Sequence, residues 1–439
     1  MDRAPPGSRR LDLSYTLRSL TNPRDAYARI VQKSGDPCWL QTVVGPVVVT
    51  GDPEGVRAIF AADPDSFEYY APEMEAPLFG ETALVFATGE QHRSDRKLIS
   101  PAFAPARMKA YGRAMADIAA RQAAAWEPDR PFDMLASALS ISLEALLQAI
   151  VGLREPTTIE RAGAATLRLS AAVTPTLLFF PALRRRFYGL GPYARFLRAS
   201  DEVDSILREQ IDERRRSSNG GEDILSLMTR ARYEDGTPMS DKKIRDELRV
   251  LLFAGHETTA IAIAWALYWI HREPSVRERL LGELAALGPS PEPEAIVALP
   301  YLDAVCQETL RLHPIIPEIV RMLRRPLALK GFSVPAGVGV LAAATLLHDR
   351  EDLYPEPRRF LPDRFLQRKF TPFEFMPFGG GAHRCLGAGL AVFEMKVVIG
   401  ALLRACELTL AGTEPIEPVR RGVTMGPRGG VPMRVVRRL

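Results

Sequence analysis

The sequence has few cysteines and no segment that divides it into separate parts. Its 439 residues include only four cysteines, Cys38, Cys306, Cys385 and Cys406, and no two of them have C-x-x-C spacing. A disulfide framework and a structural zinc site are therefore poor interpretations, and a reducing, cytoplasmic setting fits better. No Gly/Ser-rich or charge-rich linker interrupts the chain, so we predict one domain over residues 1–439.

Excess charge and a membrane-spanning segment are also lacking. The formal net charge is only +4, too small to favour a nucleic-acid-binding protein, and arginine clusters at 184–186 and 214–216 are typical of solvated helix ends. The first 20 residues have no long apolar run, so we expect neither a signal peptide nor a membrane anchor. The most apolar stretch, residues 250–270, carries His256 and Glu257 near its middle, where charge is costly in lipid. A buried helix explains it better.

The spacing of apolar residues predicts a mainly helical protein with a smaller β region. A long helical part covers residues 90–311, with breaks at Pro128, Pro156, 175–192 and 217–221. We expect these other elements: a hairpin over 39–44 and 46–50, a short helix starting at Asp52, a long loop over 67–89, strands within 319–329 and 332–341, an irregular meander over 354–377, a last helix over 386–405 and short strands over 421–437.

The most informative segment is the loop FGGGAHRCLG at residues 378–387. Its consecutive glycines can adopt positive φ and let the backbone approach a flat ligand. Cys385 stands where this loop meets the last predicted helix, whose free N–H groups and dipole stabilise a thiolate. The alternative is a small buried thiol, which we expect of the other three cysteines. Gly387 and Gly389 resemble a phosphate-binding glycine loop, but no strand precedes them and the later glycine and acidic partner are missing.

A second informative segment, residues 254–259, lies within the apolar helix and reads AGHETT. It lacks the second histidine of an H-E-x-x-H zinc helix. The Thr258 hydroxyl can instead bond back to the Ala254 carbonyl and bend the helix, and Glu257 beside it can relay protons. A generic buried helix is the alternative.

Charged pairs occur at helical spacing in two further places. Glu308 and Arg311 share a helix face, and so do His92 and Arg96. The alternatives are a surface ion pair worth about 0–1 kcal/mol and a solvated helix face. Arg321 begins the strand run ten residues after Arg311, and its planar fork suits a carboxylate.

Taken together, these segments resemble the cytochrome P450 family. The cysteine loop matches the family pattern F-x-x-G-x-[RH]-x-C-x-G through Phe378, Gly381, His383, Cys385 and Gly387. The other segments follow in the family's order over most of the chain. The resemblance implies the P450 fold, a helical body with short β-sheets and a haem between a long central helix and the helix after the cysteine loop.

The resemblance also implies residue roles. Cys385 would be the proximal iron ligand of haem b, with Phe378 beside its sulfur and His383 on a propionate, where many relatives have Arg. Glu257 and Thr258 would be the acid–alcohol pair, with Glu in place of the Asp of many bacterial members. The resemblance implies further contacts with the haem from His92, Arg96, Ala254, Arg321, Gly379 and Gly387. It also implies a buried structural triad of Glu308, Arg311 and Arg364.

The implied activity is insertion of one oxygen atom of O2 into a lipophilic small molecule, such as a fatty acid, terpenoid or steroid, by hydroxylation or epoxidation. Electrons would come from a separate ferredoxin or flavodoxin with its NAD(P)H-dependent reductase. That partner would dock on a basic surface at Arg93, Lys97 and Arg384. The pocket residues implied are Leu78, Phe86, Phe253, Ala254, Ile316, Ile319, Val320 and Met425.

Some alternatives stay open at this point. A peroxide-driven fatty-acid hydroxylase or a haem-thiolate isomerase would usually lack the acid–alcohol pair. A haem-based electron carrier or gas sensor would need neither Thr258 nor an open apolar pocket. A helical protein without haem would be colourless. We expect a cytoplasmic monomer without a membrane anchor or nucleic-acid partner.

Overall fold

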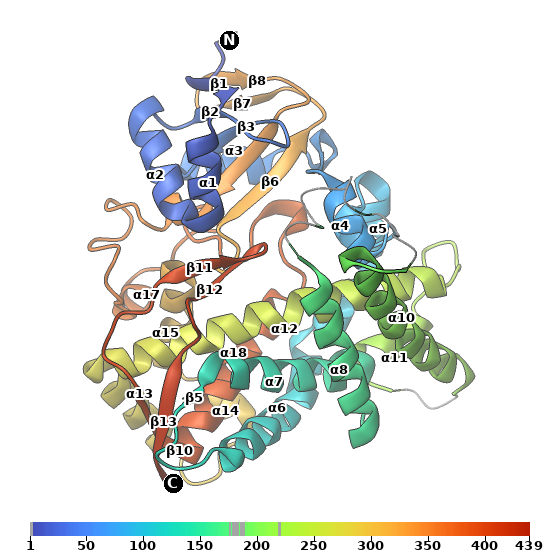
Figure 1. Cartoon of the computed structure of the whole chain (residues 1–439), viewed down its shortest axis with the longest axis vertical. Helices are drawn as coiled ribbons and strands as arrows, with labels where there is room; N and C mark the ends of the chain where they lie inside the picture. The colour runs from blue at the N-terminus through green and yellow to red at the C-terminus, as the bar shows by residue number, and fades with distance from the viewer. Residues whose placement is uncertain (1–2, 175–176, 178–183, 185–188, 218–220) are drawn as a thin grey trace.

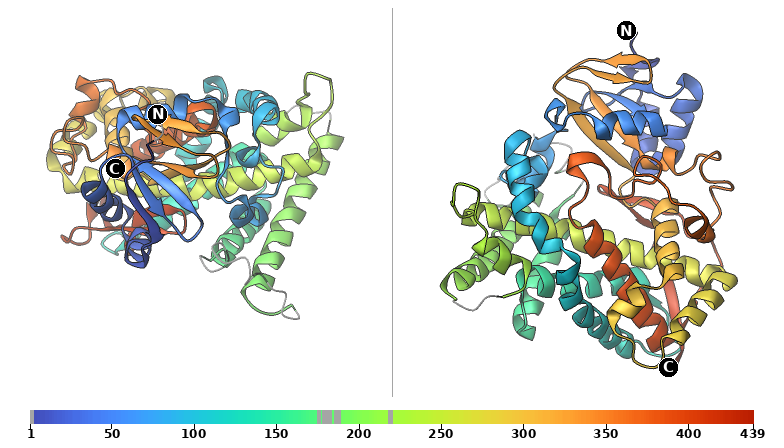
Figure 2. Two further views of the ribbon diagram at one scale, coloured as in Figure 1. Left: turned by 90° about the horizontal axis from the view of Figure 1, so that it is seen from above. Right: turned by 180° about the vertical axis from the view of Figure 1, so that it is seen from behind.

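The computed structural model describes residues 3–174, 177, 184, 189–217 and 221–439. A helical body fills the lower part of Figure 1, and a smaller β-rich part that contains the N-terminus lies above it. The view from behind in Figure 2 shows the same two regions, with the long helix α12 running through the body. The predicted architecture, mainly helical with a smaller β region, is confirmed.

Most helices belong to the body, and a few short ones accompany the sheet or the loops. The body contains α5 (Gly89–Ile99), α6 (Pro105–Ala125), α7 (Met134–Leu146), α8 (Pro156–Ala172), α10 (Pro192–Arg216), α11 (Ile224–Arg230), α12 (Asp241–Arg272), α13 (Pro274–Ala286), α14 (Pro293–Val297), α15 (Pro300–Leu312) and α18 (Ala388–Ala405). The shorter helices elsewhere are α1 (Leu13–Thr21), α2 (Pro23–Ser34), α3 (Pro53–Ala61), α4 (Pro72–Phe79), α16 (Ala344–Leu347) and α17 (Asp363–Gln367).

Helix α12 forms the axis of the body. It starts where the Ser240 side chain accepts a hydrogen bond from the Lys243 N–H, a standard helix cap, and it ends before Pro274. Residues 260–268 of this helix are buried all round, and Trp265 is fully inaccessible. Helices α7, α15 and α18 pack against it. A helix that is apolar on every side is stable only inside such a core.

The main sheet has six strands and includes β6. Its strand order is β1-β2-β3-β9-β6-β4, and β3 runs parallel to β9 with Val48 opposite Val340. Strand β6 pairs with β9 in antiparallel register, with Val320 opposite Leu341. The strands of this sheet are β1 (Gly7–Leu11), β2 (Cys38–Gln41), β3 (Pro46–Thr50), β4 (Phe67–Tyr69), β6 (Glu318–Leu323) and β9 (Gly339–Ala343).

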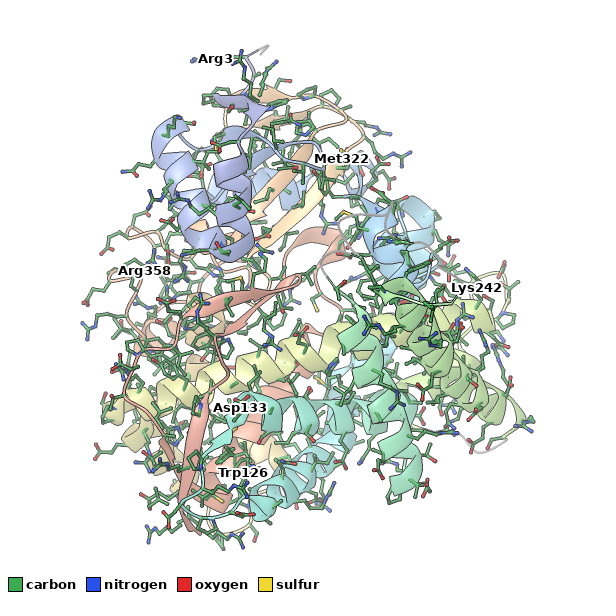
Figure 3. All side chains as sticks on the ribbon, viewed as in Figure 1. Arg3, Trp126, Asp133, Lys242, Met322 and Arg358 are labelled. Carbon is green, nitrogen blue, oxygen red and sulfur yellow. The ribbon has the colours of Figure 1, made fainter. Side chains whose placement is uncertain are left out.

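Smaller sheets complete the fold. Strands β10 (Cys406–Leu410), β13 (Pro432–Arg438) and β5 (Phe132–Asp133) form one, and β7 (Leu327–Leu329) with β8 (Phe332–Val334) forms another. The hairpin of β11 (Pro418–Arg421) and β12 (Thr424–Pro427) packs its second strand against α12. Figure 3 shows Met322 of β6 above this helix and Lys242 at the helix's starting end.

Two expected boundaries were wrong. Residues 67–89 are not a long loop, because they hold β4, α4 and the short 3-10 helix Leu84–Phe86. Pro72 starts α4 and Gly80, at φ 89°, ends it, so the local signals were in the sequence. The last helix starts at Ala388 and not at residue 386.

Other breaks agree with the sequence where the structure describes them. The hairpin over 39–50, the Asp52-capped helix and the boundaries near Pro128 and Pro156 are present. The predicted break over 175–192 falls largely outside the described residues, as do residues 185–186 of one arginine cluster and part of the 217–221 break.

Two helical stretches of the described residues are long and apolar enough to cross a membrane. They are Met134–Val151 and Asp241–Arg272, and 72% and 61% of their most apolar windows are buried inside the protein. Core helices show the same combination of length, composition and burial. The stretches are therefore weak evidence of a membrane span.

A buried carboxyl on α18 couples the stability of this core to pH. Glu394 is 1% exposed, and one of its carboxyl oxygens has no hydrogen-bond partner among the described residues. Burial raises the pKa of Glu394 to about 8, although the Ser142 hydroxyl of α7 acts to lower it. The folded protein therefore keeps Glu394 protonated near neutral pH, whereas the unfolded chain releases that proton.

Replacing Glu394 with glutamine is expected to flatten this pH dependence. The pKa of Glu394 rises from 4.5 to about 8 on folding, so its contribution is complete below pH 4.5 and is lost as pH rises through the folded value. One pKa unit equals about 1.4 kcal/mol, so the loss reaches roughly 3–5 kcal/mol in alkaline solution. Urea unfolding between about pH 5 and 9 measures it, with the exposed Glu81→Gln as control. Identical profiles for Glu394→Gln and wild type would contradict the assignment.

Candidate active site

The cysteine loop is shaped by close contact with α3. Gly379 and Gly381 both have φ +67°, a region that side chains rarely adopt. A side chain at Gly380 or Gly381 would also collide with Phe60 of α3. The Cys385 N–H donates to the Phe378 carbonyl at 3.0 Å, which closes the loop. Glycine is therefore required here for backbone geometry and for close packing.

Cys385 combines an accessible side chain with a desolvated sulfur. Its side chain is exposed, yet the surrounding protein desolvates the thiolate enough to raise the pKa of Cys385. The backbone N–H groups of Gly387 and Ala388 and the nearby Arg384 and Arg96 oppose that rise. The other three cysteines are buried, as expected.

Helix α12 presents an accessible turn at Ala254 and Thr258. The Thr258 hydroxyl donates to the Ala254 carbonyl at 2.7 Å, as the sequence predicts. Ala254 is exposed although it lies on the central helix, and Thr258 is partly exposed. A Cβ on Gly255 would lie 2.8 Å from Leu146 Cδ1, so α7 packs against this turn where the residue is small. An accessible carbonyl and hydroxyl on an otherwise buried helix can bind water or a small polar molecule.

His256 is not part of this accessible face. It is 3% exposed, and its Nδ1 lies 2.8 Å from the Leu252 carbonyl. No group of three His, Cys, Asp or Glu side chains that could hold a metal ion is found among the described residues.

Glu257 contacts a residue that the sequence did not single out. Its Oε1 lies 3.5 Å from Nε of Arg421, at the end of β11. The exposed fractions of the two side chains are 28% and 40%. The acid beside Thr258 is therefore loosely held by one guanidinium nitrogen.

Cationic and imidazole groups gather on the other side of the cysteine loop. The rings of His92 and His383 stack with centroids 3.9 Å apart. Burial, with help from Arg96 and Arg321, lowers the pKa of His92 to about 4 and that of His383 to about 3. Arg96 donates to the Arg384 carbonyl at 2.8 Å, so α5 is tied to the loop.

Arg321 of β6 has no ion-pair partner among the described residues. Desolvation lowers its pKa to about 10, and only Tyr69 opposes that change. A desolvated guanidinium without a partner is unfavourable unless an anion joins it. Together with Arg96, His92 and His383, it forms a place that suits carboxylates.

The donor set fits a haem. A haem would need a ligand for its iron and cations near its two carboxylates, and a glycine backbone can approach its flat face closely. Cys385, the loop packed on Phe60, and the group of Arg96, Arg321, His92 and His383 meet these requirements. Ala254 and Thr258 offer an accessible turn on the helix that crosses the body.

A buried ion triad braces the meander beneath the loop. Glu308 and Arg311 are fully buried, with Nε and Oε2 2.6 Å apart, and Arg364 Nε lies 3.1 Å from Oε1 of Glu308. Arg311 also donates to the carbonyls of His348 and Pro357. The i, i+3 spacing predicts the first pair and the family resemblance implies Arg364, while the structure adds the contacts of Arg311 with the two carbonyls.

Apart from Ala254, which is exposed, the predicted pocket residues divide into two groups. Phe86, Phe253, Ile316, Ile319 and Val320 are partly buried, as the walls of a pocket would be. Phe79 links the first two, since its ring lies 6.3 Å from Phe86 and 6.0 Å from Phe253. The second group, Leu78 and Met425, is buried, and Leu78 belongs to the helical core.

Sequence reasoning missed three residues that shape this site. Phe60 and Leu146 come from distant helices, and no local pattern indicates their contacts. Arg421 lies close to the turn at Thr424 and Met425, which the sequence did suggest for the pocket. A charged residue beside a predicted pocket turn was the available signal.

The proposed basic surface is partly neutralised. Arg93 pairs with Glu90 and Asp65, and Lys97 pairs with Glu234 at 2.6 Å. Arg384 is exposed and has no ion-pair partner among the described residues. Of the three candidates, Arg384 is the one that offers an uncompensated charge near Cys385.

The comparisons with known proteins agree with this geometry. The family model for cytochrome P450 matches residues 5–431. The chain is 33% identical to cytochrome P450 135B1 of Mycobacterium bovis over 89% of this chain and 82% of that protein. It is 31% identical to cytochrome P450 138 of the same organism, over 98% and 95% of the two chains.

Solved structures show the same fold. A cyanobacterial protein, CYP120A1 with bound retinoic acid, superposes with a TM-score of 0.87 at 26% identity, over 100% of both chains. The haem domain of cytochrome P450DA superposes with a TM-score of 0.84 at 21% identity, which shows the fold alone.

Proposed function

The chain belongs to the cytochrome P450 family, and from this premise we propose that Cys385 supplies the thiolate that ligates its haem iron. Members of this family are haem-thiolate monooxygenases that use haem b and O2, so the protein is an oxidoreductase of that class. The observation that carries the residue assignment is the position of Cys385. It is accessible and stands in the loop just before α18, with the backbone N–H groups of Gly387 and Ala388 directed at its sulfur.

Other residues would hold the haem in place. His92, Arg96, Arg321 and His383 would bind the propionates, because they gather at one edge and Arg321 lacks another anion. Phe378, Gly379 and Gly387 would approach from the loop, and Ala254 from the opposite side. When bound, haem b activates O2 and transfers one oxygen atom, and thiolate ligation favours cleavage of the O–O bond.

Thr258 and Glu257 would control protons on the helix side. The Thr258 hydroxyl is held by the Ala254 carbonyl at 2.7 Å and can pass a proton to a small molecule beside this accessible turn. Glu257 is partly exposed, so it can exchange protons with water outside and deliver them to Thr258. The accessible Thr258 hydroxyl argues against a simple haem carrier, which would need no such group.

The apolar character of the predicted pocket residues supports a more specific class of substrate. The partly buried residues Phe86, Phe253, Ile316, Ile319 and Val320 are all apolar, so a fatty acid, a terpenoid or a steroid-like molecule is proposed. Leu78 and Met425 would contribute from behind these walls. The retinoic acid bound to the cyanobacterial relative is an example of a lipophilic ligand with a carboxylate.

Electrons would come from a separate acidic protein, a ferredoxin or flavodoxin with its NAD(P)H-dependent reductase. Arg384 offers an uncompensated charge for docking near Cys385, with Arg93 and Lys97 on the neighbouring helix α5. We further propose a cytoplasmic monomer that forms a single domain over residues 1–439.

Replacing Thr258 with alanine tests the monooxygenase assignment. The best-binding compound of a panel of fatty acids, terpenes and steroids serves as substrate, with ferredoxin and its reductase as electron source. Product per NAD(P)H should fall several-fold while release of hydrogen peroxide rises and the bound haem is retained, because the accessible hydroxyl that passes the proton is lost. Thr258→Ser should keep most of the coupling.

The neighbouring Thr259 provides the matched control. It is buried on another face of α12, so Thr259→Val should leave product per electron unchanged. Equal coupling in Thr258→Ala and wild type would remove the proton role from Thr258. Turnover with peroxide alone, and none with reduced ferredoxin, would favour the peroxide-driven hydroxylase.

A further inference from the structure

Two consecutive arginines at the end of β11 are held very differently. Arg420 pairs with Glu318 at 2.6 Å, and both side chains are less than one fifth exposed, at 13% and 18%. Arg421 reaches Glu257 only through Nε at 3.5 Å, and its side chain is 40% exposed. A charge-assisted hydrogen bond is normally about 2.7–2.9 Å long, so the second contact is weak. Of these two arginines, only Arg420 is therefore held in a short, largely buried ion pair.

The fork of Arg421 remains available. Neither of its terminal nitrogens forms a hydrogen bond or ion pair with a described residue. Those nitrogens form part of the planar edge that binds carboxylates through two parallel hydrogen bonds. Arg421 therefore has unused binding capacity of one specific kind.

The hairpin is built to lay this side chain against α12. A Cβ at Gly426 would lie 2.7 Å from Arg421 Cδ and 3.5 Å from Ile261 Cδ1, so the glycine leaves room for the arginine stem. Ile261 follows Glu257 by one helical turn on the same face of α12. The Met425 N–H donates to the Ile315 carbonyl at 2.8 Å, which ties the hairpin to the segment leading into β6. The guanidinium is thus brought beside the acid–alcohol turn by fixed backbone.

We propose that Arg421 is the carboxylate-recognition residue of the substrate pocket, and that a lipophilic carboxylic acid displaces Glu257 from it. This inference rests on the proposed monooxygenase function and names its substrate class. The apolar part of the acid lies along the walls formed by Phe253, Ile316 and Val320, while its carboxylate takes the free edge of Arg421.

The exchange has a consequence for Glu257. A second carboxylate on the same guanidinium repels the first, since like charges at such distances disfavour each other. Glu257 then leaves the weak 3.5 Å contact and turns toward water and Thr258. An acidic substrate therefore releases the proton-delivering residue, whereas a neutral analogue leaves it tied to Arg421.

Binding calorimetry on the haem-loaded protein tests this inference. Dodecanoic acid should bind about 10- to 100-fold more tightly than 1-dodecanol, because only the acid makes a charged bidentate contact. Arg421→Gln should remove that preference by weakening the acid alone, and Arg421→Lys should retain only part of it, because lysine keeps the charge without the fork. The wild-type protein should also convert more of its electrons into product with the acid than with the alcohol, and Arg421→Gln should remove this difference by freeing Glu257.

Two further variants separate recognition from general effects. Gly426→Ala keeps Arg421, but the added methyl group would displace the Arg421 side chain, so this variant should also lower the preference for the acid. Arg428→Gln is the matched control in the same hairpin region, since Arg428 is exposed and paired with Glu417 at 3.6 Å, and it should change nothing. Equal affinity for acid and alcohol, no binding of either dodecanoic or hexadecanoic acid, or an unchanged preference in Arg421→Gln would overturn the inference. If any of these results came with a normal spectrum of the reduced, carbon monoxide-bound wild-type protein, the monooxygenase assignment would stand and only the role of Arg421 would be wrong.

Discussion

Replacing Glu308 with glutamine is expected to destabilise the protein by about 3–5 kcal/mol, because it leaves a buried guanidinium without its counter-charge. The Glu308 carboxylate accepts from Arg311 Nε at 2.6 Å, from Arg311 Nη2 at 2.8 Å, from the Leu361 N–H at 2.8 Å and from Arg364 Nε at 3.1 Å. Glu308 and Arg311 are fully buried, so water cannot replace the lost charge.

The effect should extend to the meander. Arg364 and the Leu361 backbone depend on the same carboxylate, and Arg311 also holds the carbonyls of His348 and Pro357. Loosening these contacts frees the segment that precedes the cysteine loop, so haem content should fall together with stability.

Urea unfolding of the purified protein measures the change, with haem content determined in parallel. Glu127→Gln is the matched control, since Glu127 and Arg130 have the same i, i+3 spacing but exposed fractions of 67% and 71%. Its cost should stay within about 1 kcal/mol. A loss in Glu308→Gln as small as in the control would mean that the triad does not brace this region.

Replacing Cys385 with alanine should have the largest effect on activity. Desolvation raises the pKa of Cys385. The N–H groups of Gly387 and Ala388 and the cations Arg384 and Arg96 act in the opposite direction and favour a thiolate. A bound metal ion deprotonates a coordinating thiol, so haem iron would hold Cys385 in its thiolate form. Alanine removes the ligand while the glycine loop, closed by backbone contacts and Phe60, is preserved. Monooxygenase turnover should therefore be lost from a folded protein.

Cys406→Ala provides the comparison for that variant. Cys406 is 2% exposed in the core at the end of α18, where it has a purely packing role. It should retain turnover, with a cost of only about 1–2 kcal/mol in stability from the small cavity. Loss of activity in both variants to the same degree would point to a general folding defect.

The sequence predicted the parts of the site that follow local rules. Spacing of three residues placed Glu308 on Arg311, and spacing of four placed the Thr258 hydroxyl on the Ala254 carbonyl. The loop glycines before Cys385 were predicted from their conformational freedom. Each of these inferences depends on neighbours within one turn or one loop.

The parts that were missed depend on long-range packing. Phe60 lies more than 300 positions before the glycine loop that it contacts, and Leu146 reaches Gly255 from another helix. Arg421 meets Glu257 only because β12 packs against α12, and no spacing rule expresses that placement. Helix α4 is different, since Pro72 and Gly80 mark its ends in the sequence, although the residues between them lack a clear helical pattern and predict a loop.

The most direct measurement is the optical spectrum of the reduced protein with carbon monoxide bound. If Cys385 ligates the iron as a thiolate, wild-type protein should show the strongly red-shifted Soret band of thiolate-ligated haem, and folded Cys385→Ala should lack it while Cys406→Ala keeps it. A normal band in Cys385→Ala, or no such band in folded, haem-loaded wild-type protein, would contradict the account.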